Sequence, residues 1–164
     1  MHLSSPIRIL LAGLAIASSG ALAAVTVSHS EAGRYSDAGD RGQENRTVDE
    51  IKRHLELLGE RYLLPSQNLK IEIVDIDLAG RLRFSARRGE EIRVLDGGAD
   101  WPSMKLRYTL ESDGKVIDSR EETVSDMSYL LKPAPSGSGA LYYEKRMLDD
   151  WFRQRFVEGR RPPR

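Results

Sequence analysis

The sequence has 164 residues, with 25 basic and 25 acidic side chains and no cysteine. This balance of charge argues against a dedicated binder of nucleic acid or another polyanion. The absence of cysteine excludes disulfides, thiolate metal sites, a cysteine nucleophile and a lipid anchor on cysteine. The length suits a single domain, whose stability must come from its hydrophobic core.

The N-terminal segment has the features of a secretory signal peptide. Arg8 supplies a short positive region, residues 9–17 form an apolar run too short to span a bilayer, and Ala21-Leu22-Ala23 is a small-x-small cleavage site. We therefore expect residues 1–23 to be removed and the mature protein to be periplasmic or secreted. No later apolar run approaches the roughly 20 residues of a transmembrane helix, so we expect no membrane span in the mature chain.

A short strand over residues 25–27 and a glycine-containing polar loop precede the first predicted helix. Thr47 and Glu50 have the spacing of a capping box, which predicts that the helix begins at Thr47. Four large side chains then recur at helical spacing and should face the core: Ile51, Leu55, Leu58 and Tyr62. Pro65 should end this helix.

The middle of the chain has the patterns of strands. Apolar and charged residues alternate over 69–78, but the phase slips near Ile73 and Val74, which indicates a β-bulge or burial on both faces. A charged connection over residues 80–91 contains an expected strand around Leu82 and Phe84. Residues 92–95 are expected to form another short strand.

The clearest hairpin follows Trp101-Pro102. Residues 104–110 alternate apolar and polar, Asp113-Gly114 supplies a two-residue turn, and residues 115–124 return as the antiparallel partner. With that turn, Lys105 would lie opposite Glu122, which is favourable. Arg107 would lie opposite Arg120, which is unfavourable.

After a loop rich in proline and glycine, an amphipathic helix is predicted from Leu141 to Phe156. Its polar face should carry Glu144, Lys145, Arg146, Asp149, Asp150 and Arg153, with Asp149 and Arg153 supporting each other at i, i+4. The order of elements predicts an α+β fold, with both helices packed on one face of a mostly antiparallel twisted sheet in a two-layer sandwich. We expect one domain over residues 24–158, a flexible basic tail over 159–164, and a solvated outer sheet face.

Three motifs of the mature chain resemble one known family: residues 73–80 (IVDIDLAG), 124–127 (VSDM) and 143–152 (YEKRMLDDWF). They are similar to secreted bacterial proteins grouped as domain of unknown function 3016. The resemblance covers most of the mature chain and implies an exported, single-domain protein. It implies no catalytic residue, cofactor or partner.

Carboxylates form the first candidate site. Asp75 and Asp77 should share a face of their strand, close enough to Glu72 or Asp126 to bind a divalent cation through oxygen ligands. Their spacing matches no calcium loop, and a solvated strand end or a carboxylate that caps a loop explains the pattern as well. A structural role, as a solvated strand end or a loop cap, is favoured over a metal site, so no metal is assigned.

Hydroxyls and a carboxylate after the hairpin form the second candidate, in residues 124–129. A serine hydrolase would need a base near its nucleophile and an oxyanion hole. The mature chain has only His29 and His54, and it contains no G-x-S-x-G elbow. Ser125 and Asp126 are therefore expected to cap turns, and no catalytic residue is assigned.

Aromatic side chains of the last helix form the third candidate, because they span more of its circumference than one buried stripe. Leu148, Trp151 and Phe152 should point inward. Tyr142 or Tyr143 should be the more accessible contact, with Arg146 as a polar neighbour. The aromatic residues could instead all be shared between the sheet and the preceding loop.

Two functions follow from these features. The favoured one is a non-catalytic, envelope-associated binding module without a cofactor, which contacts an envelope protein or another envelope component through a sheet edge or the last helix. The alternative is a small-ligand or divalent-metal binder, or a hydrolase, that uses Asp75, Asp77 and Asp126.

Overall fold

The computed structural model describes residues 23–29, 35–39 and 42–160. The predicted signal peptide, apart from Ala23, and residues 161–164 of the predicted tail lie outside this part. The elements in chain order are β1 (Ala24–His29), α1 (Glu44–Tyr62), β2 (Gln67–Asp77), β3 (Arg81–Ser85), β4 (Glu90–Val94), β5 (Ser103–Ser112), β6 (Lys115–Ser125), η1 (Tyr129–Leu131), α2 (Tyr142–Phe156) and η2 (Glu158–Arg160).

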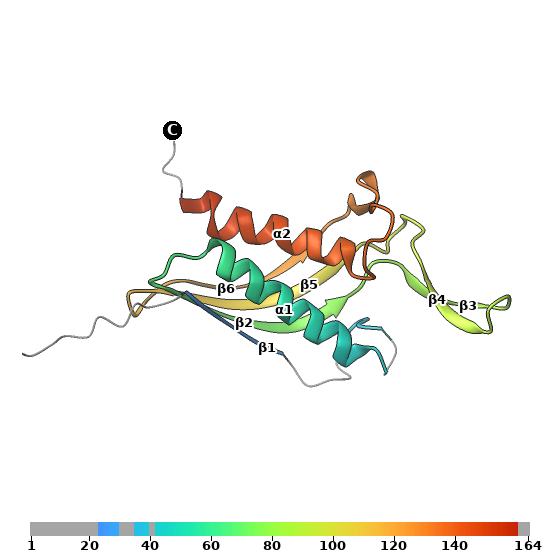
Figure 1. The fold of residues 1–164 in the computed structure, drawn as a ribbon, viewed down its shortest axis with the longest axis horizontal. Coiled ribbons are helices and arrows are strands. Elements are labelled where there is room, and N and C mark those ends of the chain that lie inside the picture. Colours follow the sequence, from blue (N-terminus) through green and yellow to red (C-terminus); the bar gives the residue numbers. More distant parts are fainter. Residues whose placement is uncertain (1–22, 30–34, 40–41, 161–164) are drawn as a thin grey trace, which may run out of the picture.

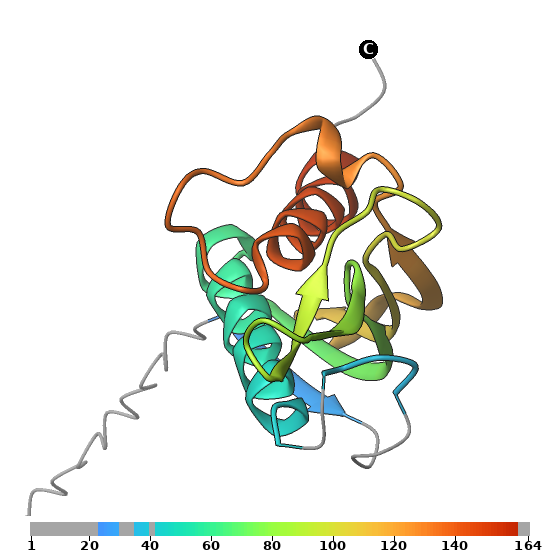
Figure 2. The ribbon, with the colours of Figure 1, turned by 90° about the vertical axis from the view of Figure 1, so that its right-hand side faces the viewer.

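Four strands form the main sheet in the order β1-β2-β5-β6, and β3 and β4 form a separate hairpin. β1 is parallel to β2, while β2, β5 and β6 are antiparallel neighbours. Both helices cover one face of the main sheet (Figures 1 and 2). These findings confirm the predicted α+β fold. No helix in the described part of the chain is long and apolar enough to cross a membrane.

Helix α1 begins earlier than predicted, at Glu44. The Thr47 N–H donates to the Gln43 carbonyl at 2.9 Å, so Thr47 lies inside the helix and the predicted capping box is wrong. Thr47 is also buried, at 8% exposed, so it does not lie at a solvated helix end. The predicted core stripe is confirmed: Ile51, Leu55 and Leu58 are buried, and Tyr62 packs at its margin.

Register shifts occur in two strands. The predicted bulge in β2 is confirmed between Ile73 and Asp75. The β5–β6 hairpin is also confirmed, but a bulge between Leu110 and Glu111 makes its predicted register wrong. This bulge places Arg107 opposite Glu121, which it contacts at 2.6 Å on the solvated outer face. The unfavourable arginine pair expected from a regular hairpin is thereby avoided.

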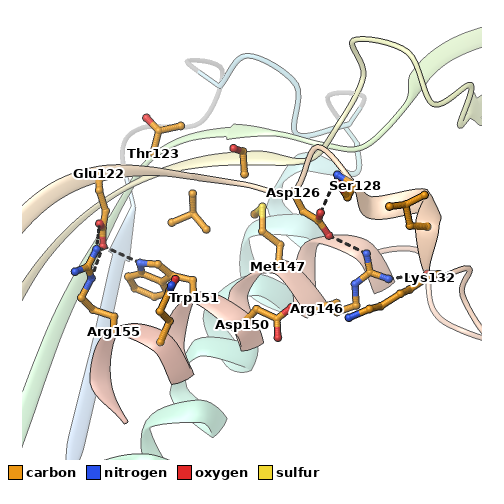
Figure 3. Close-up of a pocket in the computed structure, with 14 residues that line it drawn as sticks. Glu122, Thr123, Asp126, Ser128, Lys132, Arg146, Met147, Asp150, Trp151 and Arg155 are labelled. Atoms are coloured by element: carbon orange, nitrogen blue, oxygen red, sulfur yellow. Dashed lines mark hydrogen bonds and ion pairs between the residues drawn. The ribbon is translucent and has the colours of Figure 1, made fainter. Parts of the chain in front are cut away.

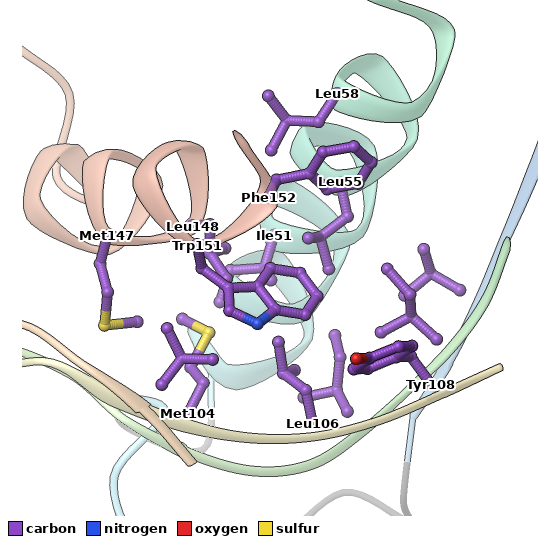
Figure 4. Packing of buried hydrophobic residues seen from close by; sticks show 14 of the residues in the cluster. Ile51, Leu55, Leu58, Met104, Leu106, Tyr108, Met147, Leu148, Trp151 and Phe152 are labelled. Atoms are coloured by element: carbon purple, nitrogen blue, oxygen red, sulfur yellow. The ribbon is translucent and has the colours of Figure 1, made fainter. Parts of the chain in front are cut away.

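The hydrophobic core lies between the helices and the sheet. Leu148, Trp151 and Phe152 of α2 point inward as predicted, toward Ile51 of α1 and Leu106 of β5 (Figure 4). The predicted ion pair between Asp149 and Arg153 is wrong. Asp149 instead contacts His54 of α1 at 2.9 Å, and Arg153 contacts Asp150 at 2.7 Å. Packing the two helices together brings His54 within reach of Asp149.

The β3–β4 hairpin projects from one end of the domain (Figure 1) and confirms the strand predicted around Leu82 and Phe84. Its base is held by Arg93, which contacts Asp37 at 2.8 Å and donates to the carbonyls of Ala79 and Gly80. Gly80 has a φ of +78°, and a Cβ there would lie 2.4 Å from the Val94 carbonyl oxygen. The turn into the hairpin therefore requires glycine.

Candidate functional site

A groove runs between the C-terminal half of β6 and helix α2 (Figure 3). We call it the β6–α2 groove. Its cavity volume is about 470 Å³. The lining residues are Glu122–Asp126, Ser128, Leu131, Lys132, Arg146, Met147, Asp150, Trp151, Gln154 and Arg155. Strand β6 ends the order of the main sheet, so the groove lies beside an edge strand.

One end of the groove is fixed by Glu122. Its Oε1 accepts hydrogen bonds from Trp151 Nε1 at 2.8 Å and from Arg155 Nε at 3.2 Å. Its Oε2 accepts a second bond from Arg155 at 2.5 Å. Because these bonds join β6 to α2, they set the width of the groove at this end and hold Trp151 in one orientation.

The other end is fixed by Arg146, which donates to Asp126 at 2.8 Å and to the carbonyls of Tyr129 and Lys132 at 2.8 and 2.6 Å. Burial lowers the pKa of Arg146, but the hydrogen bonds and charges of Asp126 and Tyr142 together outweigh this effect, and the net shift is upward. Arg146 therefore stays charged and ties the segment after β6 to α2.

The three predicted carboxylates do not come together. Asp75 accepts two 2.7 Å hydrogen bonds from Ser36, whereas Asp126 pairs with Arg146 and accepts the Ser128 N–H at 3.0 Å. β5 separates Asp77 from the end of β6 by two strand spacings, about 10 Å. In the described residues, no group of three or more His, Cys, Asp or Glu side chains is placed to hold a metal ion.

Asp77 remains close to other carboxylates. Burial, followed by the charges of Asp37 and Asp75, raises its pKa. These neighbours belong to the loop before α1 and to β2, so the cluster sits where that loop pairs with the end of β2. Asp75 and Asp126 hold loops, which agrees with the structural interpretation of both residues.

The expected accessibility of the aromatic residues is wrong for Tyr143. Tyr143 is buried with Tyr129 and Ala79 in a second apolar cluster, and Trp151, Phe152 and Phe156 belong to the main core. Tyr142 is half-buried and packs against that second cluster. The segment before α2 and the turn after β6 cover part of the α2 surface. The helical periodicity of α2 gave no partner for this part. A Tyr143 variant would therefore test stability as well as binding.

Glu144 was predicted on the solvated face of α2, but it is only 2% exposed, so this prediction is wrong. Its Oε1 accepts the Ala79 N–H at 2.8 Å. Its Oε2 is buried and has no hydrogen-bond partner among the residues that the structure describes. Burial raises the pKa of this carboxyl, and hydrogen bonding to Ala79 opposes the shift only in part.

The buried Glu144 predicts a loss of stability with rising pH. Because its pKa is raised in the folded state, its favourable contribution is complete below the ordinary value of 4.5 and is lost as pH rises through the folded-state pKa. We expect Glu144→Gln to remove this part of the pH dependence. Urea unfolding of both proteins between about pH 4 and about pH 8 would measure it, and parallel stability curves would contradict the prediction.

Sequence reasoning missed Glu122 and Glu144 as structural residues. Glu122 sits among alternating charges of a predicted solvated strand, which give no signal for its bonds to Trp151 and Arg155. Glu144 lies among charged residues on a helix, and its bond to Ala79 joins residues 65 positions apart. Neither role has a local sequence signature.

The molecule is thus a two-layer α+β domain with a groove beside its edge strand. The chain belongs to the family described as "Protein of unknown function (DUF3016)", whose model matches residues 23–154. No curated protein and no solved structure matches the chain.

Proposed function

We propose that this protein is a non-catalytic binding module that holds an extended segment of another exported polypeptide in the β6–α2 groove. The observation that carries the proposal is the position of the groove beside an edge strand. An edge strand presents backbone N–H and C=O groups without a strand partner, and an extended chain can pair with them. Side chains of the added strand would then lie against α2.

The distribution of charge along β6 supports the same location. Charged side chains occur along β6 from Lys115 to Glu122, and charged side chains are a common device against pairing at an edge. The part that lines the groove includes the uncharged run Thr123-Val124-Ser125. The strand thus carries charges along most of its length and is uncharged in these last three residues beside the groove.

Apolar side chains beside the groove supply further contact area. Leu131 lines the groove and is 81% exposed, and Met127, in the same segment, is 70% exposed. Covering such side chains would favour association through the hydrophobic effect. The groove ends are already held by the bonds of Glu122 and Arg146, so a partner would meet a preformed surface.

The export of both partners is part of the proposal and rests on the signal-like features of residues 1–23. In an exported location, the two polypeptides would meet in the same compartment. The proposal needs no cofactor and assigns no reaction.

Site-specific photo-crosslinking in the native host tests this function. A photoreactive residue at Gln154, which is exposed and lines the groove, should give an adduct with a defined segment of one partner. Thr123→Lys should lower the adduct yield by about tenfold, because a lysine blocks pairing at an edge. The matched change Thr26→Lys, on the opposite edge strand β1, should leave the yield unchanged.

Two results would contradict the proposal. One is equal loss of adduct from the Thr123 and Thr26 variants, since this would show no preference for the β6 edge. The other is an adduct whose yield is insensitive to both changes. Circular dichroism and thermal unfolding of the purified variants would establish that each keeps its fold.

A further inference from the structure

A second concavity, separate from the β6–α2 groove, lies beside the N-terminal end of α2. We call it the hairpin cleft, because one wall is the β3–β4 hairpin and the others are the first turns of α1 and the segment before α2. In Figure 2 the hairpin faces the viewer, beside α1 and that segment. The cleft has a volume of about 660 Å³, in the range of small-molecule sites.

The cleft has apolar walls. Leu82 and Leu95 come from the hairpin region, and Leu141 comes from the start of α2. Leu82 and Leu95 are 38% and 39% exposed, so a bound molecule would cover apolar surface that is now solvated. The cleft is therefore suited to a ligand with an apolar body.

Glu144 lies at the edge of this cleft, and its carboxyl is incompletely bonded. Oε1 accepts a hydrogen bond from the Ala79 N–H, whereas the buried Oε2 has no hydrogen-bond partner in the described part of the chain. A buried polar atom without a partner costs free energy, and such cases in native proteins call for an explanation. A ligand that donates to Oε2 would remove this cost.

The cations near Glu144 are already paired. Arg93 is held by both oxygens of Asp37 at 2.8 and 2.9 Å, and Lys145 is held by Glu50 at 2.5 Å. The remaining charges of the lining, Arg46 and Glu91, are exposed and of opposite sign. Glu144 makes no ion pair in the described part of the chain, although the charge of Arg93, itself paired with Asp37, still acts on it.

We propose that the hairpin cleft binds a small, largely apolar molecule bearing a protonated amine, which donates a hydrogen bond to Glu144 Oε2. The ammonium supplies both the missing donor and a direct ion-pair partner, and the leucines contact the apolar body. Since Oε2 is sealed from solvent, binding requires an adjustment of the wall. The segment before α2 lines the cleft, and space is open beside it, since a Cβ at Gly137 or Gly139 would have no atom within 4 Å.

The test is an NMR titration of the isotope-labelled full chain with 2-naphthylmethylamine, with 2-naphthylmethanol as a neutral probe of the same shape. We expect saturable shifts for residues of the cleft and tighter binding of the amine. Glu144→Gln should weaken amine binding by about tenfold and change alcohol binding by less than about twofold, because only the ammonium needs the carboxylate charge. Glu60→Gln, at an exposed position of α1 outside the lining of both concavities, is the matched control and should alter neither.

A second variant keeps the test decisive if Glu144→Gln fails to fold. Leu82→Arg changes an exposed wall residue, and its added positive charge should weaken amine binding by about tenfold. The proposal is overturned if amine and alcohol bind equally well to the unmodified protein, if neither binds saturably, or if Glu144→Gln and Leu82→Arg both leave amine affinity unchanged.

Discussion

Replacement of Phe152 by alanine is expected to lower the free energy of unfolding by about 3–5 kcal/mol, the usual cost of removing a buried aromatic ring. Phe152 is fully buried, and its ring centroid lies 4.7 Å from that of Phe156 and 6.0 Å from that of Trp151. Its truncation would leave a cavity between α1 and α2 that neighbouring rings can fill only in part. Urea unfolding measures the loss.

Phe84 provides the matched control, because it is the same residue type on the projecting hairpin and is 70% exposed. Phe84→Ala should change the free energy of unfolding by no more than about 0.5 kcal/mol. Similar losses in the two variants would mean that Phe152 does not occupy the core position described. Since Phe152 lies beside Trp151, its truncation is also expected to disturb the wall of the β6–α2 groove. Tests of binding are therefore better made with exposed residues.

Gly59→Ala is expected to destabilise the protein by about 1–3 kcal/mol, although alanine is the better helix former. A Cβ at residue 59 would lie 1.8 Å from Val25 Cγ2 and 3.0 Å from Val25 Cβ. Helix α1 and strand β1 can approach this closely only because residue 59 has no side chain. The substitution should therefore push β1 away from α1, and thermal or urea unfolding measures the cost.

A double-mutant cycle identifies the cause. Val25→Ala removes the clashing Cγ2 atom, so combining it with Gly59→Ala should cost less than the sum of the two single changes. Additive losses would show that the penalty at Gly59 does not come from contact with Val25. A gain in stability for Gly59→Ala alone would show that β1 packs less closely than described.

The two proposed binding sites lie on different surfaces of the domain. The β6–α2 groove depends on the edge of the main sheet, and the hairpin cleft depends on the buried carboxyl of Glu144. Helix α2 contributes to both, with Gln154 near one end and Glu144 near the other. Variants on one surface can therefore serve as controls for the other.

Local periodicity was sufficient to predict most elements and the inward side chains of both helices. Ile51, Leu55, Trp151 and Phe152 recur at helical spacing, and the phase slip near Ile73 marked the bulge in β2. These features depend on residues close together in the chain, so they are readable without knowing the fold. The capping box at Thr47 failed because the helix begins earlier, at Glu44, and Thr47 is buried within it.

The α+β class, the order of helices and strands, and the alternation that gives the sheet a solvated face could all be predicted from local sequence patterns. Three-dimensional contacts were needed to show that β6 is an edge strand, that Glu122 joins it to Trp151, and that Tyr143 and Glu144 are buried. The physical reason is the range of the interactions. Strand order and burial are set by contacts such as Ala79 with Glu144, between residues whose separation along the chain leaves no periodic signal.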